Sequence, residues 1–538
     1  MKLANSRFRP PTPGWRSTVA AVLVFLSTGL AALAVTPLQY EFLKLRAADG
    51  AEGDGFGFSV ALSGDTAVVG ASRDDDKGDA SGSAYVFVRD GAGNWSQHAK
   101  LLAVDGAAGD SFGDSVALDG DTMVVGARFD DDNGNGSGSA YVFIRDGGGN
   151  WSQQAKLLPA DGTAGKQFGA TVAIESDTAV VGAPWDASAY VFVRDGGGNW
   201  SQQAKLLTHG DEIHQLFGNS VALDGNTALV GAPSVYFEGV SGSAHVYVRD
   251  GTGSWKLEAT LLAADGVIDL FGYSVALDGD TAVVGAYGDG DEGDDGDFTG
   301  SAYVFVRDGA ENWSQRAKLL AADSAAADLF GWSVALDGDT AVLAAIRDDD
   351  NGVDSGAAYV FVRDATGNWT ERSKLLASDG AEGDHFGGHV GVSGGWAIAG
   401  APSHDASFAD QGAAYLFTIA VEGPRRVAID TKPSNPNNPV NPFNNGRLWV
   451  AILAEEEFDP LQVDVASVRF GPGNATTNST RVRDVNHDGL PDLMLRFVIP
   501  ELGVSCGMER LSLSGRTFAG DEIFGDDFIR TVHCHNRR

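Results

Sequence analysis

Cysteine is nearly missing from this chain: its 538 residues include only Cys506 and Cys534. Two thiols exclude a disulfide-rich scaffold but allow one disulfide in an oxidising compartment. We expect the two to pair, because no metal or redox motif surrounds them. The closed loop would then contribute about 3–4 kcal/mol in the chain-entropy model. Two free thiols are the alternative.

Basic residues are scarce as well. The 38 Lys and Arg face 73 Asp and Glu, which gives a formal net charge of −35. A surface this acidic repels phosphate backbones, so we expect no nucleic-acid partner. The same surface attracts metal cations.

Catalytic motifs are also lacking. The ten histidines show no zinc spacing such as H-E-x-x-H. The segment GVSGG (391–395) formally fits G-x-S-x-G, but it falls between two expected strands, whereas a nucleophile elbow needs a strand-to-helix turn. We therefore assign no catalytic residue and expect a protein that is not an enzyme.

Long apolar runs are limited to one, Val19–Val35, which follows a leader with four basic and no acidic residues. The run ends in a small-x-small exit, so residues 1–34 are expected to be a cleaved signal peptide; a retained anchor is the alternative. No later stretch is apolar enough to cross a bilayer. We therefore expect no membrane span in the mature protein and a secreted or cell-surface location.

Glycine, by contrast, is abundant, with 72 residues, and much of it belongs to an internal repeat. A Phe-Gly pair recurs seven times, about 55 residues apart. Each repeat contains four runs of β-branched, aromatic and apolar residues separated by turn signals, without helical periodicity. A four-stranded antiparallel unit at this period predicts an all-β fold of propeller blades. The pairs begin at Phe56, Phe112, Phe168, Phe217, Phe271, Phe330 and Phe386.

One strand is out of place in this count. The seventh repeat ends after its AYLF strand at Phe417, yet an unmatched copy of the fourth strand, FLKLRAADG, precedes the first Phe-Gly pair, at Phe42–Gly50. Pairing of this N-terminal strand with the last repeat would close a ring and leave no unpaired edge. We therefore predict a seven-bladed β-propeller over residues 42–418.

The recurring FG-x-SVAL…VVGA…GSAYVF pattern resembles the FG-GAP repeats of integrin α-subunit propellers, and a bacterial secreted version more closely. Val230–Pro233 and Ala399–Pro402 carry the GAP element. The resemblance implies a propeller and, by analogy, adhesion. It does not imply the integrin calcium sites, because the loop that holds them there is here only Asp119-Gly120-Asp121 and its equivalents, too short to wrap a cation.

Acidic runs fall instead between the second and third strands of four repeats. Calcium takes six to eight oxygen ligands, so these carboxylates are possible calcium ligands; ordinary solvated turns are the alternative. Since alternate turns of a meander fall on opposite faces, these loops should share one acidic face with the connectors between blades. The candidates are Asp74, Asp75, Asp76, Asp130, Asp131, Asp132, Asp289, Asp291, Asp348, Asp349 and Asp350.

A second domain is expected after a Pro/Asn-rich linker at 419–446. Residues 447–538 contain alternating strands typical of a small β-sandwich, and the segment resembles a C-terminal module of secreted bacterial proteins. Its best motif is DVNHDGLPD, which matches a calcium-wrapping loop without the final Glu of an EF-hand. The alternative is an ordinary Asn/Asp hairpin. The expected calcium ligands are Asp484, Asn486, Asp488, Leu490 (by its carbonyl) and Asp492.

These features together predict an exported, non-enzymatic binding or adhesion protein. Its propeller would present a rigid acidic face, assisted by calcium, to an extracellular protein or glycan. Two alternatives remain open: a secreted enzyme acting on polysaccharide through a channel-side carboxylate site, and a surface scaffold without a dedicated ligand.

Overall fold

The structure is a computed structural model. It describes residues 41–538 except 92, 209–215, 235–241, 266–269, 291–296, 406–407, 420–424, 434–437, 455–457, 474, 478, 509, 518–521, 533 and 535–538. The expected signal peptide at 1–34 and the possible ligand Asp291 therefore lie outside the described residues. Within the described part of the chain, no helix has the length and apolar character that a membrane crossing requires.

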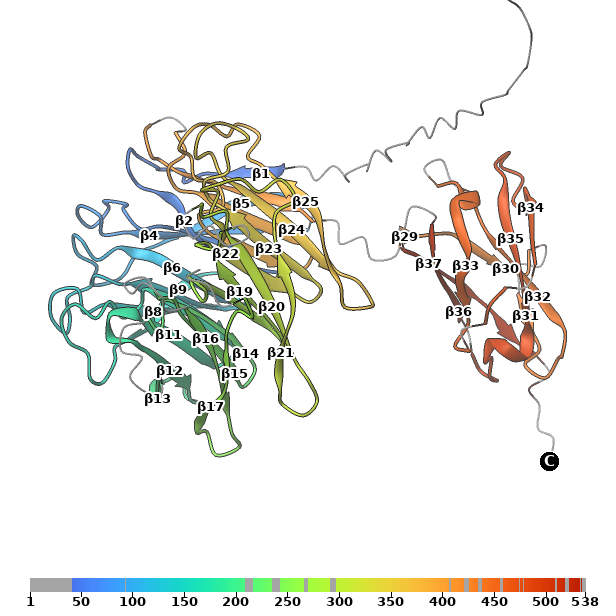
Figure 1. Cartoon of the computed structure of the whole chain (residues 1–538), viewed down its shortest axis with the longest axis horizontal. Helices are drawn as coiled ribbons and strands as arrows, with labels where there is room; N and C mark the ends of the chain where they lie inside the picture. The colour runs from blue at the N-terminus through green and yellow to red at the C-terminus, as the bar shows by residue number, and fades with distance from the viewer. Residues whose placement is uncertain are drawn as a thin grey trace, which may run out of the picture. The chain divides into compact units, whose positions relative to one another are not determined.

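Seven four-stranded antiparallel sheets form the blades of a β-propeller, as predicted (Figure 1). Six of them use consecutive strands, from innermost to outermost. They are β2 (Phe56–Ser63), β3 (Thr66–Ala71), β4 (Ser83–Arg89) and β5 (Trp95–Leu101); β6 (Phe112–Asp119), β7 (Thr122–Ala127), β8 (Ser139–Arg145) and β9 (Trp151–Leu157); β10 (Thr171–Glu175), β11 (Thr178–Ala183), β12 (Ser188–Arg194) and β13 (Trp200–Leu207), with the 3-10 helix η1 (Pro184–Asp186); β14 (Ser220–Asp224), β15 (Thr227–Ala232), β16 (Ser243–Arg249) and β17 (Trp255–Leu261); β18 (Ser274–Asp278), β19 (Thr281–Ala286), β20 (Ser301–Arg307) and β21 (Trp313–Leu319); and β22 (Phe330–Asp337), β23 (Thr340–Ala345), β24 (Ala357–Arg363) and β25 (Trp369–Leu375).

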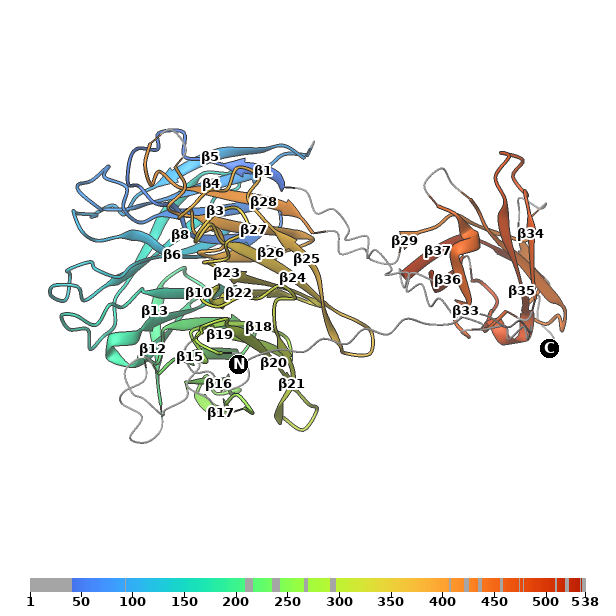
Figure 2. The ribbon, with the colours of Figure 1, turned by 45° about the horizontal axis from the view of Figure 1, so that its top comes forward.

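The seventh blade contains strands from both ends of the propeller sequence. It consists of β26 (Val390–Ser393), β27 (Trp396–Ala401), β28 (Ala413–Thr418) and, on its outer edge, β1 (Glu41–Leu45). The antiparallel register places Leu45 opposite Ala414, and Figure 2 shows β1 (blue) beside β28 (orange). The predicted closure by the N-terminal strand is confirmed, and it pairs the edge that β28 would otherwise expose.

Close approach between neighbouring blades explains the repeated glycines. A Cβ atom built on Gly126, in the VVGA segment of β7, would lie 2.0 Å from the carbonyl oxygen of Gly169 in the next blade. No side chain fits at that distance. The Phe of each Phe-Gly pair is fully buried; Phe112, for example, packs edge-to-face on Tyr141 with ring centroids 5.4 Å apart. The repeat therefore places a glycine and a buried phenylalanine where blades meet.

The C-terminal residues form a separate β-sandwich with two four-stranded sheets. Its core includes Val450, Phe470, Leu495, Phe497 and Leu513. One sheet contains β29 (Arg425–Arg426), β37 (Glu522–Phe528), β36 (Arg510–Thr517) and β33 (Val463–Phe470). The other contains β30 (Ile429–Thr431), β32 (Arg447–Ile452), β35 (Asp492–Val498) and β34 (Thr480–Arg483); β31 (Pro439–Val440) pairs with β38 (Arg530–Thr531), and η2 (Pro460–Gln462) and η3 (Ile499–Leu502) are 3-10 helices.

Two features of this domain bear on the sequence predictions. The strands β29 to β31 come from the stretch expected to be a linker, because buried residues such as Val427 and Val440 complete the core. The sandwich thus begins before residue 447. Cys506 and Cys534 form a disulfide with Cα atoms 5.6 Å apart, as expected from the sequence.

Candidate functional site

One face of the propeller carries both the loops between second and third strands and the connectors between blades. Backbone hydrogen bonds join them: the N–H of Gly109 in a connector donates to the carbonyl of Asp79 in such a loop, at 2.8 Å. Equivalent bonds recur between Gly165 and Asn135. We call this the connector face. The inference that these two sets of segments share one face is confirmed.

The acidic runs on the connector face surround lysine side chains. Lys100, on the outer strand β5, places its Nζ atom 2.9 Å from Asp74, 2.8 Å from Asp49 and 2.7 Å from Asp76. The hydroxyl of Tyr85 also donates to Asp74 at 2.9 Å. Burial alone would lower the pKa of Lys100, but hydrogen bonds to the three carboxylates raise it. Each such cluster, which we call a lysine cage, ties a connector and a loop to the outer strand.

The lysine cage recurs around the ring. Lys156 binds Asp105, Asp130 and Asp132, and Lys374 binds Asp323, Asp348 and Asp350. Lys205 and Lys318 each bind two described carboxylates, namely Asp161 with Asp186 and Asp265 with Asp289.

Two blades depart from the pattern in an informative way. In the fourth blade Thr260 stands in place of the lysine, His245 in place of the tyrosine and Val235 in place of the buried aspartate, so all three members change together. In the seventh blade His404 replaces the aspartate, while the tyrosine and the lysine are kept; Lys44 forms its ion pair with Asp379 and also contacts Nε2 of His404. Burial accordingly lowers the pKa of Lys44, against the direction of the other cage lysines. The three residues thus change together in the fourth blade, whereas only the aspartate changes in the seventh.

The possible calcium ligands of the propeller all have structural roles in the described loops. The first residues of the runs, Asp74, Asp130, Asp289 and Asp348, are buried and accept from Tyr and Lys. The middle ones, Asp75, Asp131 and Asp349, accept backbone N–H groups of their own loops. The third ones, Asp76, Asp132 and Asp350, pair with the cage lysines. The first and third carboxylates of these runs thus already have a cationic partner, and the middle ones are held by backbone amides. Among all the described residues, those of the C-terminal loop included, no group of three or more His, Cys, Asp or Glu is arranged to hold a metal ion.

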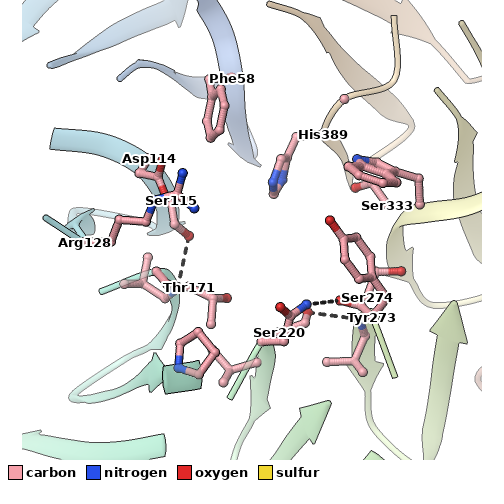
Figure 3. Close-up of a pocket in the computed structure, with 18 of the residues that line it drawn as sticks. Phe58, Asp114, Ser115, Arg128, Thr171, Ser220, Tyr273, Ser274, Ser333 and His389 are labelled. Carbon is pink, nitrogen blue, oxygen red and sulfur yellow. Dashed lines mark hydrogen bonds and ion pairs between the residues drawn. The ribbon is translucent and has the colours of Figure 1, made fainter. Parts of the chain in front are cut away.

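The centre of the ring opens into a cavity of about 410 Å³ lined by the first residues of the inner strands. A serine in this region links successive blades: Ser59 donates to the carbonyl of Gly113 at 2.7 Å, and Ser115 accepts from the N–H of Val172 at 3.1 Å. Figure 3 shows side chains from different blades around a common open centre. The serines make the rigid wall of the cavity.

The residue that directly follows each Phe-Gly pair differs from blade to blade, although the residues around it repeat. Most of these side chains line the cavity or its mouth. The variable positions are Phe58, Asp114, Ala170, Asn219, Tyr273, Trp332 and Gly388. The backbone and serine positions of the cavity wall therefore repeat from blade to blade, whereas the side chains that project from the variable positions do not.

Asp114 and Arg128 form an ion pair in this cavity, with Oδ2 and Nε 3.3 Å apart. Asp114 is 4% exposed, and burial raises its pKa to about 6, while Arg128 and Arg73 act in the opposite direction. The Nε atom of Arg128 is buried without a hydrogen-bond partner, whereas about a third of its side chain is accessible. The pair presents a carboxyl that titrates near neutrality and a guanidinium with unused donors.

Three aromatic side chains form a cluster of which two, Tyr273 and Trp332, line the cavity. The ring centroids of Tyr273, Tyr287 and Trp332 lie 4.5 to 5.0 Å from one another. All three are half-buried, and burial raises the pKa of both tyrosines. In the described part of the chain neither phenol hydroxyl donates a hydrogen bond. The cluster offers an apolar face with free polar edges.

His389 occupies the position where the other blades have serine or threonine, and Figure 3 shows it pointing into the cavity. Its side chain is accessible from the cavity but surrounded by the ring of blades. That burial lowers its pKa to about 4, so the imidazole is neutral at pH 7. It can donate one hydrogen bond and accept another.

A second cavity of about 250 Å³ adjoins the first and shares Phe58, Trp332 and Pro402 with it. Arg73 and Arg347 line this outer cavity. Arg73 forms no ion pair with any described carboxylate, and Arg347 reaches only Asp354, at 3.8 Å. In a chain with a net charge of −35, two arginines with so few partners form a local cationic site.

In the C-terminal domain, the predicted calcium loop joins β34 to β35. Asp484 accepts the N–H groups of His487 and Gly489, and Asp488 accepts that of Leu490. Asp492 is fully buried, and its two oxygens accept from Ala454 and Val485. Asn486 donates to Asp488 at 2.7 Å. The loop turns as the motif predicts, with its carboxylates held by backbone amides; calcium binding itself stays a prediction.

Sequence reasoning placed the candidate site on the acidic loops and missed the residues of the central cavity. A signal was present: among seven similar repeats, the position after Phe-Gly is variable. This variable position lies between the Phe-Gly and SVAL motifs that define the repeat. A strand pattern, however, does not predict which positions contact a ligand. The GVSGG segment covers the end of β26 and the two-residue turn to β27, so it lies in a strand-to-strand hairpin, as expected.

The profile of the FG-GAP repeat family matches seven segments of the chain: 41–87, 95–143, 151–192, 200–247, 255–305, 313–361 and 369–417. Each matched segment begins on the outer strand of one blade and ends on the third strand of the following blade. The first segment begins on β1, which is the outer strand of the seventh blade. No curated protein matches the chain.

Among solved structures, the chain is similar to a protein from Lactobacillus plantarum at 16% identity and a TM-score of 0.40, over 63% of this chain and 88% of that one. It is also similar to the periplasmic gluconolactonase of Pseudomonas aeruginosa at 15% identity and a TM-score of 0.38, over 60% and 86%. Since the repeat matches cover more than half of the chain and coincide with its blades, the protein belongs to the FG-GAP repeat family.

Proposed function

We propose that the protein is an exported, non-enzymatic binding protein that presents the connector face of its propeller to an extracellular protein or glycan. The observation that carries this proposal is the contrast at the central cavity. The scaffold positions repeat from blade to blade, whereas the cavity positions bring together Asp114, Arg128, Tyr273 and Trp332. A rigid wall with a few convergent polar and aromatic groups is the usual form of a ligand site.

The export part of the proposal rests on the basic leader and apolar run at the N-terminus and agrees with the Cys506–Cys534 disulfide. Disulfides persist in oxidising compartments outside the cytoplasm. Adhesion is the role implied by the resemblance to integrin-type repeats, and it enters here as analogy.

A catalytic role is supported less well by the same cavity. Hydrolysis of a glycosidic bond generally uses two carboxyl groups about 5–9.5 Å apart. Asp114 is the one carboxylate among the described residues that line the central cavity. Its raised pKa is the specific feature in favour of a secreted enzyme, which remains the second candidate.

We also propose that calcium belongs to the C-terminal loop and serves there as a structural ion. Asp484, Asn486, Asp488 and Asp492 would supply side-chain oxygens and Leu490 its carbonyl, a donor set of the kind calcium prefers. Asp488 is exposed and Asp484 is half-buried, and no described side-chain cation pairs with either carboxylate. The propeller clusters differ, because a lysine pairs with the first and third carboxylates of the run, as Lys100 does with Asp74 and Asp76.

A binding screen of the mature protein against immobilised glycans and matrix proteins, with and without calcium, tests the proposal. If the wild type binds a partner, loss of that binding in Trp332→Ala supports a ligand at the central cavity. Trp255→Ala, which changes an outer-strand tryptophan, is the control and should bind as the wild type does. Release of products from a bound polysaccharide would replace the proposal by the enzyme. Absence of binding to every immobilised glycan and protein would contradict the binding function and favour a surface scaffold without a dedicated ligand.

A further inference from the structure

The two adjoining cavities on the connector face differ in chemistry, and the difference points to one class of ligand. The inner cavity offers an aromatic surface, Tyr273 with Trp332, and two charged groups, Asp114 and Arg128, that pair with each other. The outer cavity offers the guanidinium groups of Arg73 and Arg347. Trp332 lines both cavities.

Each half of this arrangement selects a part of a ligand. Aromatic rings pack against apolar faces, and the C–H face of a pyranose is such a surface with hydroxyls around its edge. The phenol hydroxyl of Tyr273, which donates no hydrogen bond among the described residues, and the accessible part of Arg128 line the same cavity and are available to those hydroxyls. Arginine, with its planar fork of donors, prefers carboxylate and similar oxyanions.

The electrostatics of the connector face place the cationic groups at the centre. Around the rim the acidic runs are paired with the lysines of the cages, as with Lys100 and Asp74. Arg73 has no ion-pair partner among the described residues. A ligand carboxylate would therefore be attracted most strongly to the arginines of the outer cavity. The rest of this acidic chain would repel it.

We propose that the inner and outer cavities together bind an acidic sugar of an extracellular glycan. The pyranose ring would lie on the Tyr273–Trp332 surface, and its carboxylate would lie between Arg73 and Arg347. This assignment rests on the proposed binding function and narrows it to a substrate class. A neutral sugar would use only the inner cavity. An acidic peptide would use the arginines without the aromatic surface.

Isothermal titration of the full mature chain with two matched oligosaccharides, one ending in glucuronate and one ending in glucose, tests the assignment. Because charge-assisted hydrogen bonds are stronger than neutral ones, we expect the glucuronate ligand to bind at least about tenfold more tightly. The double variant Arg73→Gln/Arg347→Gln should lose this preference and keep the weaker binding of the glucose ligand. Arg316→Gln, an exposed arginine on outer strand β21, is the matched control and should behave as the wild type.

The outcomes separate this inference from the function it deepens. Equal affinity for the two sugars, no binding of either sugar, or an unchanged preference in the double variant would overturn the acidic-sugar assignment. Binding of another glycan or a matrix protein in the wider screen would still uphold the binding function. Because Arg73 and Arg347 are exposed, their replacement does not remove core packing, and circular dichroism of the variants confirms folding before titration.

Discussion

Lys156 donates a hydrogen bond across 2.9 Å to the buried carboxylate of Asp130, which also accepts from the hydroxyl of Tyr141 at 2.8 Å. Two further carboxylates, Asp105 and Asp132, lie within 2.8 Å of the same ammonium group. A side-chain cation thus stands at the centre of a cluster that, by composition, suggests a metal. This relationship explains how a strongly acidic chain folds its acidic loops into one ring.

Removing that ammonium should destabilise the propeller strongly. In Lys156→Met the three carboxylates lose their shared partner, and breaking a buried ion pair in this way typically costs about 3–5 kcal/mol. Denaturant unfolding of the variant measures the loss. Lys256→Met is the matched control, because Lys256 is 71% exposed and pairs with Asp250 in the blade without a cage, where a surface pair contributes about 0–1 kcal/mol. Equal effects of the two variants would show that the cages are not energetically important.

Acid should unfold the propeller through its cage aspartates. Hydrogen bonds from Lys205, Tyr190 and Lys166 outweigh burial and lower the pKa of Asp186 to about 2. A lowered folded pKa gives stability that is present above the unfolded value, near ~3.9, and is lost as the pH falls toward about 2. Thermal unfolding from pH 5 to pH 2.5 should therefore show a steep loss that is smaller in Asp186→Asn. A melting temperature that stays constant down to pH 2.5 would argue against this origin.

Asp114 should act in the opposite direction. Its folded pKa of about 6 exceeds the unfolded value, so its carboxylate costs stability above pH 6 and the cost disappears as the pH falls toward 4. We expect Asp114→Asn to stabilise the propeller by about 1–3 kcal/mol at pH 7.5 and to be neutral near pH 4. If the glucuronate ligand binds as proposed, its affinity should also rise from pH 7.5 to 5.5 in the wild type but not in this variant. A stabilisation independent of pH would contradict the assignment of the pKa to Asp114.

Deleting the closing strand should open the ring. A chain that starts after Arg46 lacks β1, and the edge of β28 from Ala413 to Thr418 then loses its partner. Hydrogen exchange should become faster first at the amides of β28, and the shortened protein should tend to associate through this free edge. Deletion of the residues before Glu41 alone serves as the control. Undiminished protection of β28 in the shortened chain would mean that β1 adds little to closure.

Calcium should bind in the C-terminal loop with a stoichiometry of about one ion and a Kd near the 10⁻⁴–10⁻³ M typical of extracellular modules. Asp488→Ala should abolish it, whereas Asp132→Ala, in a lysine cage of the propeller, should not. Equilibrium dialysis with elemental analysis measures both. Calcium binding that persists in Asp488→Ala would refute the assignment of the ion to the C-terminal loop. Loss of calcium in Asp132→Ala would indicate instead that the propeller face binds it.

The number of blades and the closure of the ring followed from the sequence because both depend on local order. Phe-Gly pairs, VVGA and AYVF segments repeat at a constant spacing, and a spare fourth strand before Phe56 has only one free edge to complete. The disulfide followed because Cys506 has no alternative partner. The start of the sandwich did not follow, since β29 to β31 are only two or three residues long and their assignment depends on core contacts such as those of Val440.

The order of residues along the chain is enough to define the repeat, and hence the blades, their turns and the faces on which acidic loops fall. The contacts of those carboxylates depend on the folded chain, because Lys100 and Asp49 lie 51 residues apart and meet only once the connector folds over the outer strand. The fold also decides that Asp114, Tyr273 and Trp332, from three different blades, share one cavity. Strand pattern is a short-range property of the chain, whereas a ligand site at the centre of a ring depends on contacts between distant repeats.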